Sequence, residues 1–316
     1  MPRFLRRFLR WAPDEATLVR RGFADPGPLL LERFKTIAQA FLFGYHATLE
    51  DDRIEPLAER LEAFPAEPRG FAYEGAGMAL ALLDALSLGR RDRLVEFLAG
   101  PGSPHLYIVQ IGAGWVPARL PLDSEKLRAR LDPLSGWLAC EGWGFHDGFF
   151  HPRRSVARQA VPAMRLSGYG RRAYTQGVGR SLWFICGADP ALLAAAIAKF
   201  PESRRNDLWS GLGLATAYAG GQDEAALAEL RRLAGPAAPA LAQGAAFAAE
   251  ARTRPGNPSA HTEVACRTIT GRSVEELARL VAETRPGSAD GTPEAPAFEV
   301  WRRRLQKRLA DVAIAR

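Results

Sequence analysis

A short glycine pattern recurs at nearly regular intervals along most of the chain. In each copy one residue precedes Gly-x-Gly or Gly-x-Ala, and an apolar stretch follows. The first glycines are Gly75, Gly112, Gly142, Gly177, Gly211 and Gly244, in EGAG, IGAG, EGWG, QGVG, SGLG and QGAA. The intervals are 37, 30, 35, 34 and 33 residues. A period of about 34 residues is the size of a helix–turn–helix unit, as in tetratricopeptide arrays.

The copy around Gly211 shows how one unit is expected to fold. We predict a first helix over residues 207–218 and a turn over residues 219–221. Asp223 is the expected N-cap of a second helix, EAALAELRRLAG. In the preceding copy, Asp189 and Pro190 supply an N-cap and a proline at the first helical position. We therefore predict an all-α fold, an array of helical hairpins of tetratricopeptide-like α-solenoid or toroid type.

The array has expected limits along the chain. Residues 1–28 are a basic amphipathic segment and a lead-in, and residues 29–283 are the repeat domain. Residues 284–297, TRPGSADGTPEAPA, have the composition of a linker, and residues 298–316 predict a terminal helix. Residues 1–12, MPRFLRRFLRWA, suit peripheral membrane or partner contact, but a terminal helix packed on the first repeat is the more usual outcome.

The repeat glycines need a physical reason, because each costs about 1 kcal/mol relative to alanine inside a helix. Residues i and i+2 point about 200° apart on a helix. One glycine of each pair is therefore expected to admit one neighbouring helix, and the other the next repeat. The stretch YIVQIGAGWVPARL also resembles a dinucleotide fingerprint, but Pro117 occupies the third glycine position and no acidic residue ends a second strand.

Composition excludes several classes of protein. The net charge of +7 comes from arginine, but acidic residues are interspersed, so no nucleic-acid-binding stripe is evident. No run of about 18 apolar residues predicts a transmembrane helix, and no secretory signal is recognisable. Cys140, Cys186 and Cys266 are distant from one another and lack CxxC spacing, which favours reduced thiols and a cytoplasmic location.

The residues that precede the repeat glycines form a polar row. Its members are Glu74, Glu141, Gln176, Ser210 and Gln243, and Ile111 interrupts it. Equivalent positions of stacked repeats line up on one surface. The row is therefore expected either to line a groove with Trp115, Trp143, Trp183, Trp209 and Phe247, or to satisfy neighbouring helix ends and loops.

Other polar residues extend the candidate site. Arg180 lies on one helical face with Gln176 and Trp183, so it predicts either an anion contact or a surface salt bridge. The candidate ligand-binding residues are Glu74, His105, Gln176, Arg180, Trp183, Asp207, Trp209, Ser210 and Gln243.

The segment EGWGFHDGFFH carries the candidate catalytic residues. Glu141, His146 and Asp147 are potential acid/base groups, although a buried structural histidine is more common. His146 and His151 are five residues apart and do not share a helical face, unlike the i, i+4 pair of a zinc helix. We therefore predict no metal, and nothing in the sequence indicates a cofactor.

Several long motifs carry a family resemblance. RGFAYEGAGMAL, FLAGPGSPHLYIVQIGAGW, GWGFHDGFF, GVGRSLWFICGAD, DLWSGLGLATAYAGG and AQGAAFAAEAR resemble the UnbL-type family, a domain of unknown function often encoded beside enediyne polyketide biosynthesis genes. The resemblance implies a cytoplasmic accessory protein of specialised metabolism that acts near a long polyene or its tailoring enzymes. It supplies no catalytic residues.

Two functions are consistent with these features. The first is a non-catalytic accessory protein that binds a hydrophobic intermediate or a partner biosynthetic enzyme. The second is an enzyme acting on a polyene or other lipid-like substrate in a repeat-lined cavity, with Glu141, His146 and Asp147 as acid/base groups.

Overall fold

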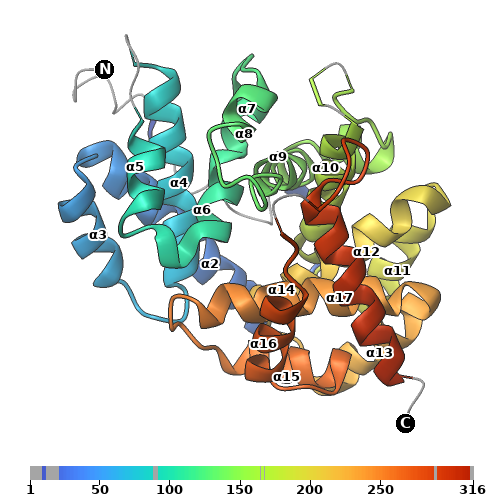
Figure 1. Ribbon diagram of the computed structural model, residues 1–316. Helices are drawn as coiled ribbons and strands as arrows, with labels where there is room; N and C mark the ends of the chain where they lie inside the picture. The colour runs from blue at the N-terminus through green and yellow to red at the C-terminus, as the bar shows by residue number, and fades with distance from the viewer. Residues whose placement is uncertain are drawn as a thin grey trace.

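The computed structural model describes residues 9–11, 21–87, 92–163, 165–166, 168–287 and 290–313. Within these ranges the regular structure is helical and no strand occurs, which confirms the all-α prediction. The helices that carry the repeat glycines form the inside of the fold (Figure 1). They are α2 (Pro28–Glu50), α4 (Arg69–Ala85), α6 (Leu106–Ala113), α9 (Leu138–Phe150), α10 (Gly168–Ile185), α12 (Glu202–Tyr218) and α14 (Ala238–Thr253).

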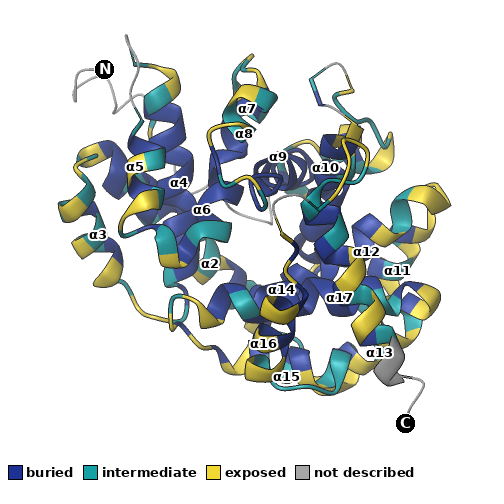
Figure 2. Ribbon diagram, viewed as in Figure 1, coloured by how far each residue is buried: buried dark blue, intermediate teal, exposed yellow. Residues whose placement is uncertain are grey.

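The other helices join and cover these helices. They are α3 (Ile54–Glu62), α5 (Arg93–Ala99), α7 (Trp115–Arg119), α8 (Ser124–Arg128), α11 (Pro190–Ala198), α13 (Glu224–Ala234), α15 (Ala260–Thr270), α16 (Val274–Thr284) and α17 (Ala297–Ala313). Figure 2 shows buried residues concentrated in the glycine-bearing helices and exposed residues on outer elements such as α3 and α13.

The helix starts follow the sequence signals. The Asp189 carboxylate accepts a hydrogen bond from Leu192 N at the start of α11, and Asp223 accepts one from Ala226 N at the start of α13. The two helices expected around Gly211 are therefore present as α12 and α13, although α12 begins at Glu202, before the expected residue. They do not pack mainly on each other: α12 packs on α10 and α14, and α13 packs on α11 and α15.

The glycine pairs lie where consecutive helices touch backbone to backbone. A Cβ atom added at Gly177 would overlap the Glu141 carbonyl oxygen of α9, and one added at Gly179 would overlap the Leu208 carbonyl oxygen of α12. The same alternation holds at Gly75 and Gly77, Gly112 and Gly114, Gly142 and Gly144, and Gly211 and Gly213. The first glycine faces the preceding helix and the second the following one, as the 200° separation predicts.

The first helices of the series also contact the last ones. Arg33 of α2 forms an ion pair with Glu67 at 2.8 Å and donates a hydrogen bond to the Ala219 carbonyl after α12. Arg252 of α14 donates to the Tyr218 carbonyl oxygen (2.6 Å) and to the Glu67 carbonyl oxygen. Residues far apart in sequence therefore face a common interior.

Two findings concern membrane contact. Across the described ranges, no helix combines the length and the apolar character that crossing a bilayer requires. Residues 1–8 and 12 of the amphipathic segment lie outside the described residues. Trp11 is described, and its side chain is buried among aromatic rings rather than exposed on the surface.

The glycine contacts predict a difference between two alanine variants of α10. Gly177→Ala should lower the free energy of unfolding by roughly 3 kcal/mol, because the new methyl group must displace the α9 backbone. Gly168→Ala is the control, since nothing lies within 4 Å of its Cβ position. Urea denaturation measures both, and equal stabilities for the two variants would contradict the packing role of the repeat glycines.

Candidate functional site

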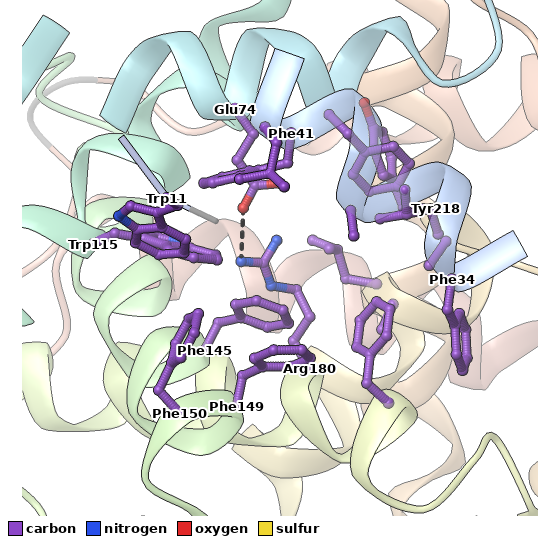
Figure 3. A pocket seen from close by; sticks show the side chains of 18 residues that line it. Trp11, Phe34, Phe41, Glu74, Trp115, Phe145, Phe149, Phe150, Arg180 and Tyr218 are labelled. Atoms are coloured by element: carbon purple, nitrogen blue, oxygen red, sulfur yellow. Dashed lines mark hydrogen bonds and ion pairs between the residues drawn. The ribbon is translucent and has the colours of Figure 1, made fainter. Parts of the chain in front are cut away.

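An aromatic pocket lies between α2, α4, α7, α9, α10 and α12 (Figure 3). It holds about 740 Å³ of space, including space open to solvent. Trp11, Trp115 and Phe150 line one end, and Phe34 and Tyr218 line the other. Phe184 also lines the pocket, with its ring centroid 4.8 Å from that of Phe34. The remaining lining residues are Ile37, Ala38, Phe41, Leu42, Phe71, Glu74, Phe145, Phe149, Arg180, Leu214, Ala215 and Ala219.

The rings of the pocket hold one another in place. Phe145 and Phe149 are one turn apart on α9 and stack with their centroids 5.8 Å apart. The Phe41 ring of α2 stacks on the Trp115 ring of α7 at 4.5 Å. Such contacts contribute about 0.5–1.5 kcal/mol each beyond the buried area. The wall is therefore assembled by tertiary packing of several helices.

Two charged side chains of this wall, Glu74 and Arg180, belong to a buried group that we call the Glu74–Arg180–Glu141 triad. Arg180 Nη2 lies 3.3 Å from Glu74 Oε1, and Arg180 Nε lies 3.0 Å from Glu141 Oε1. The guanidinium carbon also lies 4.2 Å from the centroid of the Phe145 ring. All three charged residues are buried, with 4, 6 and 1% of Glu74, Arg180 and Glu141 exposed.

Burial sets the protonation of the triad. It raises the pKa of Glu74, and it raises the pKa of Glu141 to about 7, although the Arg180 charge opposes both shifts. One guanidinium balances one carboxylate, and an apolar environment strongly disfavours a second uncompensated charge. The triad therefore holds one proton near neutral pH. Arg180 Nη2 donates a hydrogen bond to Glu74 Oε1, whereas neither carboxyl oxygen of Glu141 has a hydrogen-bond partner among the described residues. The ionised form is therefore favoured at Glu74, and the proton at Glu141.

His146 and Asp147 belong to a separate buried network. Arg119 Nε donates to His146 Nε2 (3.2 Å), so the proton of the neutral ring is on Nδ1, which donates to Asp147 Oδ1 (3.2 Å). The Tyr174 hydroxyl donates to Asp147 Oδ2 at 2.9 Å. Burial lowers the pKa of His146. Both ring nitrogens are thus engaged, and these contacts do not connect the histidine with Glu141.

The structure corrects one step of the argument against a metal. Ligand atoms of His146, Asp147 and His151 all lie within 4.8 Å of one another, although the spacing indicated no shared helical face. Helix α9 ends at Phe150, and His151 leaves helical geometry with φ −131° and ψ 49°. The donor set nevertheless fits a cation poorly, because the Arg119 guanidinium faces the accepting nitrogen of His146.

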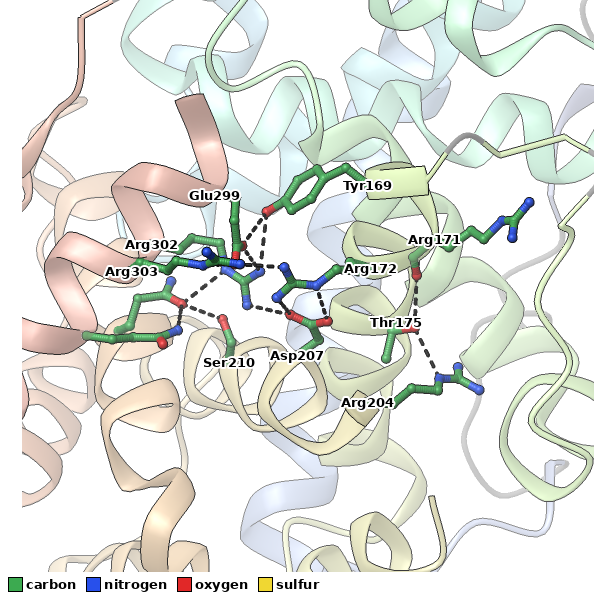
Figure 4. A network of polar contacts seen from close by, with 12 residues as sticks. Tyr169, Arg171, Arg172, Thr175, Arg204, Asp207, Ser210, Glu299, Arg302 and Arg303 are labelled. Atoms are coloured by element: carbon green, nitrogen blue, oxygen red, sulfur yellow. Dashed lines mark hydrogen bonds and ion pairs between the residues drawn. The ribbon is translucent and has the colours of Figure 1, made fainter. Parts of the chain in front are cut away.

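Three other candidates lie beneath α17 (Figure 4). Arg302 is 1% exposed, and its guanidinium pairs with Asp207 Oδ1 at 2.9 Å and Glu299 Oε2 at 3.0 Å. Its Nε donates to Gln243 Oε1 (3.3 Å), which also accepts from the Ser210 hydroxyl (2.8 Å). Arg302 of the terminal helix therefore pairs with Asp207 and Gln243, whereas Ser210 bonds to Gln243 of α14.

The remaining candidates lie outside the aromatic pocket. His105 stacks on Tyr73 at 3.7 Å, and burial together with nearby arginines lowers its pKa to about 3. Gln176, Trp183 and Trp209 are buried but do not line the pocket. Of the predicted ligand-binding residues, Glu74 and Arg180 reach it.

Sequence reasoning missed most of the aromatic lining. The segments FLFGY and GFHDGFF carry Phe41, Phe145 and Phe149 at helical spacing. That spacing also describes an ordinary helix core, so it distinguishes no pocket.

The triad predicts a pH-dependent stability difference. Because the pKa of Glu141 is raised from 4.5 to about 7, its stabilising contribution is present below pH 4.5 and is lost as the pH rises through 7. The wild type should lose on the order of 3 kcal/mol in free energy of unfolding between acidic and mildly alkaline pH, and Glu141→Gln should abolish this loss. Urea denaturation at several pH values measures it, with Glu59→Gln as the exposed control. Parallel profiles for Glu141→Gln and the wild type would refute a shared proton.

Comparison with known proteins gives one family. Neither the curated proteins nor the solved structures give a match. The family model described as "Protein of unknown function (DUF1702)" matches residues 2–309, which is nearly the whole chain. The chain therefore belongs to the DUF1702 family of proteins of unknown function.

Proposed function

We propose that the protein binds an elongated, apolar and unsaturated small molecule in the aromatic pocket. The observation that carries this proposal is the lining itself, in which ten of eighteen residues are aromatic. They are Trp11, Phe34, Phe41, Phe71, Trp115, Phe145, Phe149, Phe150, Phe184 and Tyr218. Ring faces stack on flat conjugated systems, and burying an apolar ligand removes apolar surface from water.

The triad restricts the polar part of the ligand. With one proton shared between Glu74 and Glu141, the group is neutral overall and sits in apolar surroundings. A ligand carboxylate would be repelled by the ionised glutamate, and a ligand ammonium by Arg180. A hydroxyl or carbonyl group pairs with Glu74 or Arg180 without adding charge. We therefore expect one neutral polar group on the ligand.

The family resemblance supports a biosynthetic setting for this ligand. UnbL-type proteins are often encoded beside enediyne polyketide genes, whose early products are long polyenes. A polyene intermediate combines the length, planarity and low polarity that the lining favours. On this proposal the protein is a cytoplasmic accessory protein that holds such an intermediate for a partner biosynthetic enzyme.

A pocket-filling variant tests the binding function. Ala38 lines the pocket and is half-buried, so Ala38→Trp places an indole in the ligand's space at little cost to the core. We expect the wild type to bind the neutral polyene diphenylhexatriene saturably, with a rise in probe fluorescence, and Ala38→Trp to weaken binding at least about tenfold. The matched control is Gln39→Trp, at the exposed neighbouring position of α2. Equal affinity in all three proteins would reject the pocket as the binding site.

A second candidate function is acid catalysis on the bound molecule. The observation in its favour is the buried carboxyl of Glu74 at the pocket, which shares one proton with Glu141 through the triad, since a positioned carboxyl group can act as a general acid or base. On this proposal Glu74 and Glu141 carry the acid/base role, and His146 and Asp147 are structural.

The Glu74→Gln variant separates the two functions. It keeps the shape of the side chain and removes its ionisable carboxyl, while Arg180 can still pair with Glu141, so diphenylhexatriene binding should stay within about threefold of wild type. If the protein is an enzyme, a producing strain carrying Glu74→Gln should show the metabolite profile of a deletion strain. A wild-type profile would leave binding as the function and exclude catalysis by this residue.

A further inference from the structure

A second cavity, which we call the far chamber, lies between α6, α9, α12, α14 and α17. It holds about 370 Å³ of space, including any space open to solvent. Ile111, Leu138 and Phe247 form part of its wall, and Phe298 and Trp301 of α17 form another part. No charged residue lines it, and the Trp301 indole N–H already donates to the Val281 carbonyl oxygen at 2.9 Å. The chamber therefore suits a wholly apolar group.

The far chamber and the aromatic pocket share a wall. Leu214 and Tyr218 line both cavities, and they are one turn apart on α12. Because each of these side chains contacts both spaces, the partition is a single layer of side chains. Rotation of one leucine side chain is a small and fast change compared with a movement of backbone.

Ile111, the residue that interrupts the polar row, contributes to the apolar lining of the far chamber. Glu74 precedes Gly75 on α4, and Ile111 precedes Gly112 at the equivalent position on α6. Glu74 lines the aromatic pocket, whereas Ile111 lines the far chamber. Neighbouring helices thus contribute equivalent positions to the two cavities, with a polar residue in the first and an apolar residue in the second.

We propose that the two cavities form one elongated site, in which the unbranched apolar tail of the ligand passes between Leu214 and Tyr218 into the far chamber. This inference rests on the proposed binding function and specifies its ligand class. The ligand is a linear molecule with one neutral polar group near the Glu74–Arg180–Glu141 triad and a tail without polar substituents. Phe298 and Trp301 are the large side chains that α17 adds to the lining, and we expect them to limit the length of the tail.

The chain-length dependence of binding tests the inference. Linear primary alcohols of about 8 to 20 carbons serve as competitors of diphenylhexatriene, and each methylene that enters an apolar site should improve Kd roughly fourfold. In the wild type, affinity should keep rising for alcohols longer than those that fill the aromatic pocket. Ala251→Trp places an indole of α14 in the far chamber. It should lower the ratio of the affinity for long alcohols to that for short alcohols at least about tenfold, and it should leave the affinity for short alcohols unchanged.

A second variant keeps the inference testable if Ala251→Trp fails to fold. Leu214→Ala opens the partition and should raise the same ratio about threefold or more. If the wild type binds short alcohols but both variants keep its ratio, the far chamber is not part of the site. If the wild type binds neither alcohols nor diphenylhexatriene, the proposed binding function itself is wrong.

Discussion

The structure depends on close backbone contact, at the paired glycines, between each glycine-bearing helix and the next helix of that series. Gly177 lets α10 approach the α9 carbonyls and Gly179 does the same towards α12, and other copies repeat the alternation. At this separation the residue before the first glycine of each copy is buried inside the fold, whatever its polarity. Four of these residues are Glu74, Glu141, Gln176 and Gln243, each at most 4% exposed. Each such residue then needs an internal partner or an internal ligand.

The buried side chains of the polar row find their partners in different ways along the chain. Arg180 joins Glu74 and Glu141 into one group that borders the aromatic pocket, whereas Arg302 of α17 satisfies Asp207 and Gln243. The terminal helix α17 therefore covers the buried Asp207 and Gln243 side chains, and aromatic rings surround Glu74 and Arg180. A carboxyl that keeps its proton is tolerated there because the second carboxylate already neutralises the arginine. The same arrangement places the charged side chains of Glu74 and Arg180 at the pocket.

The sequence predicted the helices well because their signals are local. The caps at Asp189 and Asp223 and the geometry of the glycine pairs depend on neighbouring residues, and all were found as expected. The pocket depends on which distant helices meet, and no local pattern reports this. Phe41 and Trp115 have the spacing of core residues, and only the packing of α2 on α7 makes them a pocket wall. His151 was misjudged for a related reason, since α9 ends one residue before it.

The most direct test of ligand binding in the interior is a crystal structure of the protein with a bound linear polyene alcohol. We expect continuous electron density along the aromatic pocket from Trp115 past Phe145 to Tyr218, with the hydroxyl against Glu74 or Arg180. An ordered polyene on the outer helices, with the pocket free of ligand density, would contradict the proposed function.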